Sequence, residues 1–374
     1  GDVYKRQLVM CLLPNAGSFG MAVSTAMIFG LVSLMFLDTS INMAMQPFKM
    51  MVGDMVNEKQ KGLAYSIQSF LCNAGSLVGF LFPFIFTWIG ISNIAPQGVV
   101  PDSVIYSFYI GAAILILCVI YTTVKVKEMP PAEYAEYHGI TEEEKKEKIN
   151  MVKLLVKAPK AFWTVGLVQF FCWFAFMFMW TYTNGSVAAN VFDAPTVETV
   201  VNGASKIVLD TKSIQYQNAA DWVGVLFAVQ AIGSVLWAVC IPMFKNRKLI
   251  YSLSLVLGGI GFISTYFVHN QYVLFISFLL IGCAWAAMLA LPFTILTNAL
   301  SGGHMGTYLG LFNGTICIPQ IVAATLGGSI LALFTPKGML PPEINMLVMA
   351  GVMLIIGAVC VYLIKETKGE QAKA

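Results

Sequence analysis

Long apolar runs dominate this 374-residue sequence. A helix needs about 20 largely apolar residues to cross the ~30 Å hydrocarbon core of a bilayer. The nine runs of this kind cover residues 19–45, 63–90, 104–124, 161–183, 222–243, 249–268, 272–297, 306–334 and 344–364. Charged residues make up only 11% of the chain, against about 25% in an average soluble domain. The sequence therefore predicts an all-α, polytopic membrane protein.

The first residues of the chain differ from the rest of the sequence. Gly1–Gln7 has neither an initiator Met nor the features of a signal peptide, and we interpret it as a non-native leader. The apolar stretch Leu8–Leu13 is too short to cross a membrane, so we expect it to be the stub of a truncated helix. The expected organisation is a leader over 1–7, the remainder of an N-terminal helix bundle over 8–125, a charged linker over 126–160, a six-helix bundle over 161–364 and a tail over 365–374.

Lysine and arginine residues gather on one side of the expected membrane. If the loops alternate sides, 17 of the 22 Lys and Arg residues fall on the side that holds the linker and the C-terminus. Cytoplasmic loops carry an excess of these residues. We therefore expect a multi-pass protein of the cell membrane with a cytoplasmic C-terminus.

Several classes of function lack their signature in this sequence. It contains no Walker loop, no HExxH and no GxSxG. The eight cysteines form no CxxC pair, which gives no indication of a metal site or a disulfide framework. The net charge of +3 is explained by the cytoplasmic lysines. We expect no enzyme, no cofactor and no nucleic-acid partner.

Asp38 lies within an otherwise apolar expected helix. Ionisable groups at membrane depth cost ~2.5–3.5 kcal/mol on insertion scales and are therefore a functional hypothesis by default. At about 100° per residue, Asn42 and Lys49 lie within about 40° of Asp38, with Pro47 interrupting the helix between them. We interpret Asp38 as a carboxylate that faces a water-filled cavity and exchanges a proton. The alternative is an Asp38 packed against polar groups and a Lys49 that extends to the headgroups.

Asp54 is expected just past the end of the same helix, in a loop that also holds Lys59 and Lys61. It could act as a gating acid through a breakable ion pair with one of these lysines. The alternative is an ordinary solvated loop acid. The sequence does not separate these two interpretations.

A stripe of aromatic and amide side chains follows the run 161–183. The spacing i, i+4, i+7, i+11, i+15 places five residues on one helix face, namely Gln169, Trp173, Phe176, Trp180 and Asn184. Indole rings stack on the apolar C–H faces of sugars and amides bind hydroxyl groups, so the stripe favours a sugar-binding surface. The competing interpretation is a lipid-facing stripe with its tryptophans in the interfacial belt.

Further amides lie inside the apolar runs. Gln230 shares a helix face with Trp237, and Asn313 shares one with Gln320. An amide within a membrane needs a polar partner, so each marks either a cavity or a hydrogen bond between helices.

The stretch 37–54 resembles the signature of the sucrose–proton symporters and their bacterial relatives, a branch of the major facilitator superfamily near the glycoside–pentoside–hexuronide symporters. The matching residues are Asp38, Asn42, Gln46, Lys49 and Asp54. Lys49 stands where plant members usually carry Arg, and Lys cannot make the bidentate contact of Arg with a carboxylate. The stretches 68–70, 173–184 and 310–320 are also similar to bacterial members.

This resemblance implies a two-bundle major facilitator fold of twelve helices, of which the chain would hold nine complete transmembrane helices and a stub. The implied activity is proton-coupled symport of a glucoside or disaccharide, such as sucrose or maltose, by alternating access. Asp38 and Lys49 would couple the proton, and Asp54 would act in gating. The expected substrate-binding residues are Asn42, Gln46, Gln68, Trp173, Trp180, Asn184, Gln230, Asn313 and Gln320.

The expected partners are a sugar, H⁺ or Na⁺ and the lipid bilayer, and the expected state is a monomer. Two alternatives stay open. One keeps the fold and carries a lysophospholipid or an amphiphilic drug. The other is a nutrient sensor that signals through the linker without transport.

Overall fold

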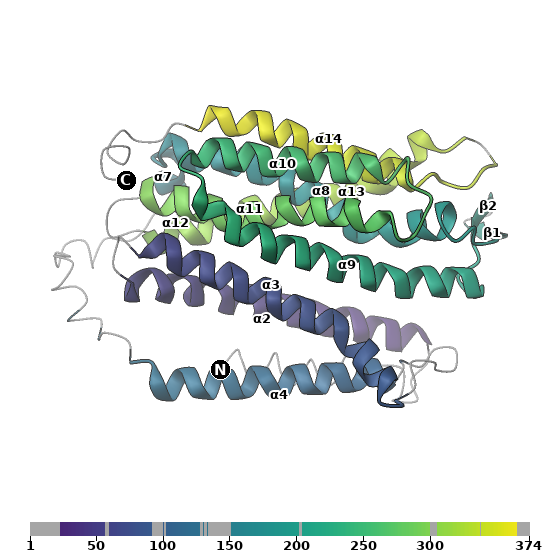
Figure 1. Ribbon diagram of the computed structural model, residues 1–374, viewed down its shortest axis with the longest axis horizontal. Helices are drawn as coiled ribbons and strands as arrows, with labels where there is room; N and C mark the ends of the chain where they lie inside the picture. Colours follow the sequence, from purple (N-terminus) through teal and green to yellow (C-terminus); the bar gives the residue numbers. More distant parts are fainter. Residues whose placement is uncertain are drawn as a thin grey trace. The chain divides into compact units, whose positions relative to one another are not determined.

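The computed structural model describes residues 23–56, 60–91, 100, 102–127, 130, 133, 151–201, 204–299, 305–336 and 338–364. Apart from one short hairpin, the regular structure of these residues is helical (Figure 1), which confirms the all-α class. The chain divides into two compact units. Unit 1 holds residues 1–64 and 78–148, and unit 2 holds residues 65–77 and 149–374. The domain boundaries expected from the sequence stay a prediction.

Unit 1 is built from α2 (Val23–Met55), the two ends of α3 (Lys61–Trp88), and α4 (Asp102–Lys125), while the middle of α3 belongs to unit 2. The backbone of α2 stays helical through Pro47, although proline removes one hydrogen bond of the helix. Membrane helices tolerate proline because other groups can satisfy the freed carbonyl. The expectation that the helix ends before Asp54 is wrong, because the backbone of Asp54 lies in the last turn of α2.

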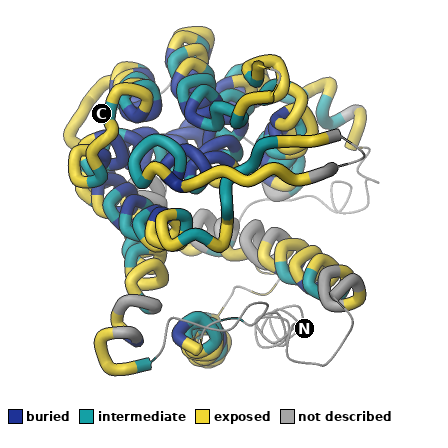
Figure 2. Tube along the Cα trace, turned by 90° about the vertical axis from the view of Figure 1, so that its right-hand side faces the viewer, coloured by how far each residue is buried: buried dark blue, intermediate teal, exposed yellow. Residues whose placement is uncertain are grey.

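The rest of the described helices belong to unit 2. They are α7 (Met151–Val156), α8 (Lys160–Asn190), α9 (Ile214–Cys240), η2 (Ile241–Met243), α10 (Arg247–Ser264), α11 (Leu274–Ala299), α12 (Met305–Phe312), α13 (Gly314–Phe334), α14 (Ile344–Cys360) and η3 (Val361–Leu363). Helix α8 packs against α13 and α14, and α11 packs against α9 and α10. The buried residues, dark blue in Figure 2, gather among these packed helices. The core of unit 2 is rich in phenylalanine, with Phe162, Phe176, Phe262 and Phe278 almost fully buried.

Seven helices of the described residues are long and apolar enough to cross a membrane. They cover residues 102–125, 160–190, 214–243, 247–264, 274–296, 307–334 and 344–363. Within α2 and α3 the described residues contain the shorter apolar stretches Ile28–Ile41 and Phe70–Phe82. Each apolar run singled out in the sequence coincides with a helix or, for 306–334, with the pair α12 and α13. The number of complete spans stays a prediction.

A β-hairpin joins α8 to α9. Its strands are β1 (Thr196–Val201) and β2 (Ala204–Leu209), which pair antiparallel with Thr196 opposite Leu209. Strand β1 holds three valines and two threonines, and β2 holds one isoleucine and one valine; such β-branched residues favour extended backbone. We call this end of unit 2 the hairpin end; α8 and α10 finish there, and α9, α11 and α14 begin there (Figure 1).

Glycines bring the backbones of α9 and α11 into direct contact. A Cβ atom on Gly282 of α11 would overlap the carbonyl oxygen of Gln230 and lie 2.7 Å from the amide nitrogen of Ser234. A Cβ atom on Gly233 of α9 would lie 2.9 Å from the Cα atom of Leu279. Real Cβ atoms are essentially never this close to other heavy atoms. The two helices can therefore pack this tightly only because both positions lack a side chain.

Candidate functional site

Four aromatic rings of unit 2 form what we call the aromatic cluster: Trp173, Phe176 and Trp180 from α8 and Trp285 from α11. The ring centroid of Trp285 lies 5.8 Å from that of Trp173, 4.9 Å from that of Phe176 and 5.8 Å from that of Trp180. The centroids of Trp173 and Trp180 are 6.4 Å apart, which confirms that they share a helix face. Trp285 meets both other indoles close to edge-on, at 76° and 83°, a favourable geometry for aromatic pairs.

A buried amide fixes the orientation of Trp173. The indole Nε1 of Trp173 donates a hydrogen bond of 2.6 Å to Oε1 of Gln169. The Nε2 atom of Gln169 donates in turn to the hydroxyl of Tyr251 and to the carbonyl oxygen of Met288, each at 3.1 Å. Gln169 is thus engaged by the protein itself and acts as a positioning residue. Since its N–H group is also engaged, Trp173 can offer a ligand its ring face.

The burial of the aromatic cluster tests whether the stripe faces lipid. Phe176 is fully buried, with 0% of its surface exposed, whereas Trp180 is 43% exposed on unit 2. Phe176 packs against Phe262 of α10 with ring centroids 5.8 Å apart. The stripe is therefore part of the packing between α8, α10 and α11 rather than a continuous outward-facing row.

Asn184 lies one helical turn beyond Trp180 on α8. Its Nδ2 atom donates a hydrogen bond of 3.0 Å to the hydroxyl of Tyr216 on α9. Its Oδ1 atom is buried and has no hydrogen-bond partner among the described residues. A buried acceptor without a partner costs free energy, about 1–3 kcal/mol, so a hydrogen bond donated to this oxygen would be stabilising.

Asn313 lies at the junction of α12 and α13, and its Oδ1 atom is likewise buried without a partner in the described part of the chain. Its Nδ2 atom is 3.8 Å from Sγ of Cys317. Thr315 lies next to Gly166 of α8, where a Cβ atom would be 3.0 Å from its Cγ2. Asn184 lies 18 residues beyond Gly166 on α8, which is a distance of about 27 Å at 1.5 Å per residue. One disaccharide cannot reach both asparagines at the same time.

The other amides expected at the site differ in their surroundings. Gln230 is buried on α9, while Gln68 on α3 and Gln320 on α13 are partly exposed. Trp237, which shares a face with Gln230, donates its Nε1 hydrogen to Oγ of Ser254 on α10 at 2.8 Å. This hydrogen bond joins α9 and α10, as expected for a polar residue that takes part in helix packing rather than in a cavity.

Three residues of these surroundings were missed by sequence reasoning. Trp285 lies in an apolar run without a polar neighbour that would single it out, and Tyr216 precedes the run expected to cross the membrane. Asn73 of α3 is almost fully buried in unit 2, where Ser234 of α9 donates a hydrogen bond of 2.9 Å to its Oδ1 atom. A polar residue within an apolar run was the available signal for Asn73.

Asp38 is exposed on α2 of unit 1. Ser33 and Ser40 of the same helix are buried and lie about 140–160° around the helix from Asp38. The side chains of Asn42, Gln46, Lys49 and Asp54 lie outside the described ones. The acid–amide–base face of this helix therefore stays a prediction.

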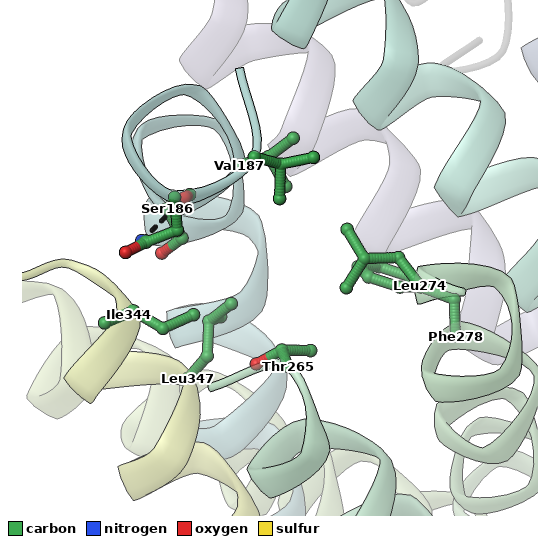
Figure 3. Close-up of a pocket in the computed structure, with 9 residues that line it drawn as sticks. Ser186, Val187, Thr265, Leu274, Phe278, Ile344 and Leu347 are labelled. Carbon is green, nitrogen blue, oxygen red and sulfur yellow. Dashed lines mark hydrogen bonds between the residues drawn. The ribbon is translucent and has the colours of Figure 1, made fainter. Parts of the chain in front are cut away.

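A small pocket lies at the hairpin end of unit 2 (Figure 3). It is lined by Ser186, Val187, Asn190, Val191, Thr265, Leu274, Phe278, Ile344 and Leu347. The hydroxyls of Ser186 and Thr265 donate to the carbonyl oxygens of Tyr182 and Phe262, each at 2.7 Å. The pocket thus offers mainly apolar surface, which suits a sugar poorly. Among the described residues, no group of three or more His, Cys, Asp or Glu side chains could hold a metal ion.

The family model of the Major Facilitator Superfamily matches residues 2–209 and 196–374. The chain therefore belongs to this superfamily. It is a multi-pass membrane protein and a transporter rather than an enzyme. A search of curated protein sequences found no match.

Several solved structures of transporters have a fold similar to that of this chain. The fucose:proton symporter of E. coli has a TM-score of 0.61 and 14% identity, covering 98% of this chain and 83% of that chain. The inward-open xylose transporter of E. coli has a TM-score of 0.57 and 12% identity, covering 99% of this chain and 81% of that chain. A POT family transporter in complex with 5-aminolevulinic acid has a TM-score of 0.53 and 12% identity, covering 97% and 80%. At these identities the likeness shows the fold alone.

Proposed function

We propose that the protein is a proton-coupled symporter that carries a glucoside or a disaccharide, sucrose- or maltose-like, by alternating access. The observation that carries this proposal is the aromatic cluster, with the unpartnered amide oxygen of Asn184 one turn beyond it. Two similar structures are described as a fucose:proton symporter and a xylose transporter, which supports a sugar as cargo. We also propose the cell membrane as location, with the C-terminus in the cytoplasm.

The cluster suits the two kinds of surface that a sugar presents. Trp173 offers its ring face, because its N–H group already bonds Gln169. Trp180 is partly exposed and extends this apolar surface toward Asn184. A sugar ring stacked on the indoles therefore has an acceptor for one hydroxyl about 6 Å further along α8. Such a combination of aromatic surface and a few convergent polar groups is typical of small-molecule sites.

Amide side chains on other helices are further candidates for binding the sugar. We propose Asn42, Gln46, Gln68, Gln230 and Gln320 as further hydrogen-bond partners. Asn313 is too far from Asn184 for both to hold one sugar at once, so we assign it to a different stage of the passage. We assign proton coupling to Asp38 with Lys49 as its basic partner, and gating to Asp54.

Replacing Trp285 by Ala tests the aromatic cluster directly. Trp285 contacts all three other rings, and each aromatic pair contributes about 0.5–1.5 kcal/mol beyond its buried area. These pair energies stabilise the cluster itself, so removing Trp285 changes sugar affinity by releasing the rings that Trp285 holds in place. We expect the Kd for sucrose or maltose to rise about tenfold, which corresponds to about 1.4 kcal/mol of binding free energy. The measurement is isothermal titration calorimetry on the purified protein.

The matched control is Trp163→Ala on the same helix as most of the cluster. Trp163 is 51% exposed, and its ring contacts that of Phe162, which is not part of the cluster. We expect its Kd to equal that of the unmodified protein. Unchanged sugar affinity in Trp173→Ala, Trp180→Ala and Trp285→Ala, or tight binding of lysophospholipid in place of sugar, would contradict the proposal.

A further inference from the structure

Glu343 is held rigidly at the start of α14. Its amide nitrogen donates to the carbonyl oxygen of Pro341 at 2.9 Å, and its own carbonyl oxygen accepts from the amide of Met346 at 3.0 Å. Pro341 and Pro342 precede it and restrict the backbone on that side. The residue lies just outside the span 344–363. Its side chain is therefore anchored at the hairpin end, beside the helices that it contacts.

The carboxyl group of Glu343 lies against the bare backbone of α8. A Cβ atom on Gly185 would overlap this carboxyl group. Gly185 is buried, and α8 and α14 pack along each other at this point. The missing side chain of Gly185 therefore provides the space that the carboxyl group occupies.

The surroundings of this carboxyl group do not stabilise a charge. Within the described residues its side chain has no hydrogen bond and no ion pair. Tyr182, one turn earlier on α8, is the described titratable group that interacts with it electrostatically, and a tyrosine brings no positive charge. Lys337, in the loop before α14, lies outside the described residues. Burial raises the pKa of Glu343 from 4.5 to about 7.

We propose that the carboxyl group of Glu343 is a proton-binding site that holds the start of α14 on α8 when protonated and loosens this contact when ionised. A neutral carboxylic acid can pack against Gly185 and Tyr182 at little cost. A carboxylate there must either lose its hydration or pull water between the two helices. Proton binding to Glu343 thus stabilises the contact between α14 and α8.

The direction of the pH effect follows from the pKa of Glu343 in the two states. The carboxyl binds its proton more tightly when packed, with a pKa of about 7, than when solvated, with a pKa of 4.5. The packed contact is therefore fully stabilised below the solvated value and loses this stabilisation as the pH rises through about 7. With the C-terminus in the cytoplasm, as we propose, the hairpin end faces outward. The external pH would then determine how stable the contact between α14 and α8 is.

Hydrogen–deuterium exchange on the purified protein at about pH 5 and about pH 9 tests this site. After correction for intrinsic exchange, we expect the protection of residues 344–350 and 180–190 to fall at least tenfold at the higher pH, since one pKa unit corresponds to tenfold. Glu343→Gln mimics the protonated acid and is expected to stay protected at both pH values. The control Glu198→Gln, at an exposed position of β1, is expected to behave like the unmodified protein.

A second variant keeps the test decisive if Glu343→Gln does not fold. Gly185→Ala displaces the carboxyl from its place, so its exchange is expected to be fast at both pH values. In the unmodified protein, the infrared band of protonated carboxylic acids is expected near neutral pH, and the part of it that comes from Glu343 is expected to be lost in Gly185→Ala, which weakens the band. Protection that does not change with pH in the unmodified protein, or that still changes in Glu343→Gln, would overturn the proposal. Neither readout involves sugar, so failure here leaves the proposed transport function intact.

Discussion

Replacing Asp38 by Asn is expected to abolish sugar-driven proton uptake while exchange of preloaded sugar continues. The carboxylate must be neutralised before the pathway can close around it, because a charge removed from water is costly. Asparagine is permanently neutral, so the carrier can still change conformation with sugar bound but has no site to load or release the proton. The measurement compares sugar-dependent pH change and labelled-sugar exchange in proteoliposomes that contain the protein.

The matched control is Asp102→Asn in the same unit. Asp102 is exposed in the first turn of α4, where a carboxylate stabilises the helix by about 0.3–1 kcal/mol. We expect both proton uptake and exchange to survive this change. Proton uptake that persists in Asp38→Asn would refute the coupling role of Asp38. Uptake driven by Na⁺ in place of H⁺ would reassign the coupling ion.

Replacing Gly282 by Ala is expected to destabilise the protein strongly, although it adds a single methyl group. The new Cβ atom would overlap the carbonyl oxygen of Gln230 and lie 2.7 Å from the amide nitrogen of Ser234. Both are backbone atoms, so α9 and α11 must separate. Overpacking of this kind costs about 1–3 kcal/mol or more, and we expect Tm in detergent to fall by about 5–10 °C.

Gly328→Ala in α13 is the control for this substitution. Nothing lies within 4 Å of a Cβ atom built at that position. Alanine is the better helix former by about 1 kcal/mol, so Tm is expected to stay constant or rise. Equal melting temperatures for the two variants would show that α9 and α11 are not held in close backbone contact.

The sequence predicts where the helices of unit 2 lie but not where each one ends. The apolar run 161–183 locates α8, because a membrane helix must present apolar side chains over its whole crossing. Helix α8 nevertheless continues to Asn190, and the hairpin that follows it is built from residues with no apolar signal of membrane type. The junction of α12 and α13 at Asn313 also cannot be located from hydropathy, since both helices are equally apolar.

The candidate site was predictable only within one helix. Angles along α8 correctly place Trp173 and Trp180 on a shared face, because the helical repeat fixes these positions. The contribution of Trp285 depends on how α11 packs against α8. The spacing of residues within one helix gives no information on this packing. The same holds for the bond between Asn184 and Tyr216 of α9.

The close spacing of Trp173, Trp180 and Trp285 has an optical consequence. Three of the seven tryptophans of the chain have ring centroids between 5.8 and 6.4 Å apart, near enough for their electronic transitions to couple. This coupling depends on the angles between the rings, so a molecule that slides between them alters the near-ultraviolet circular dichroism. The protein therefore carries a built-in spectroscopic reporter of occupancy that needs no attached dye.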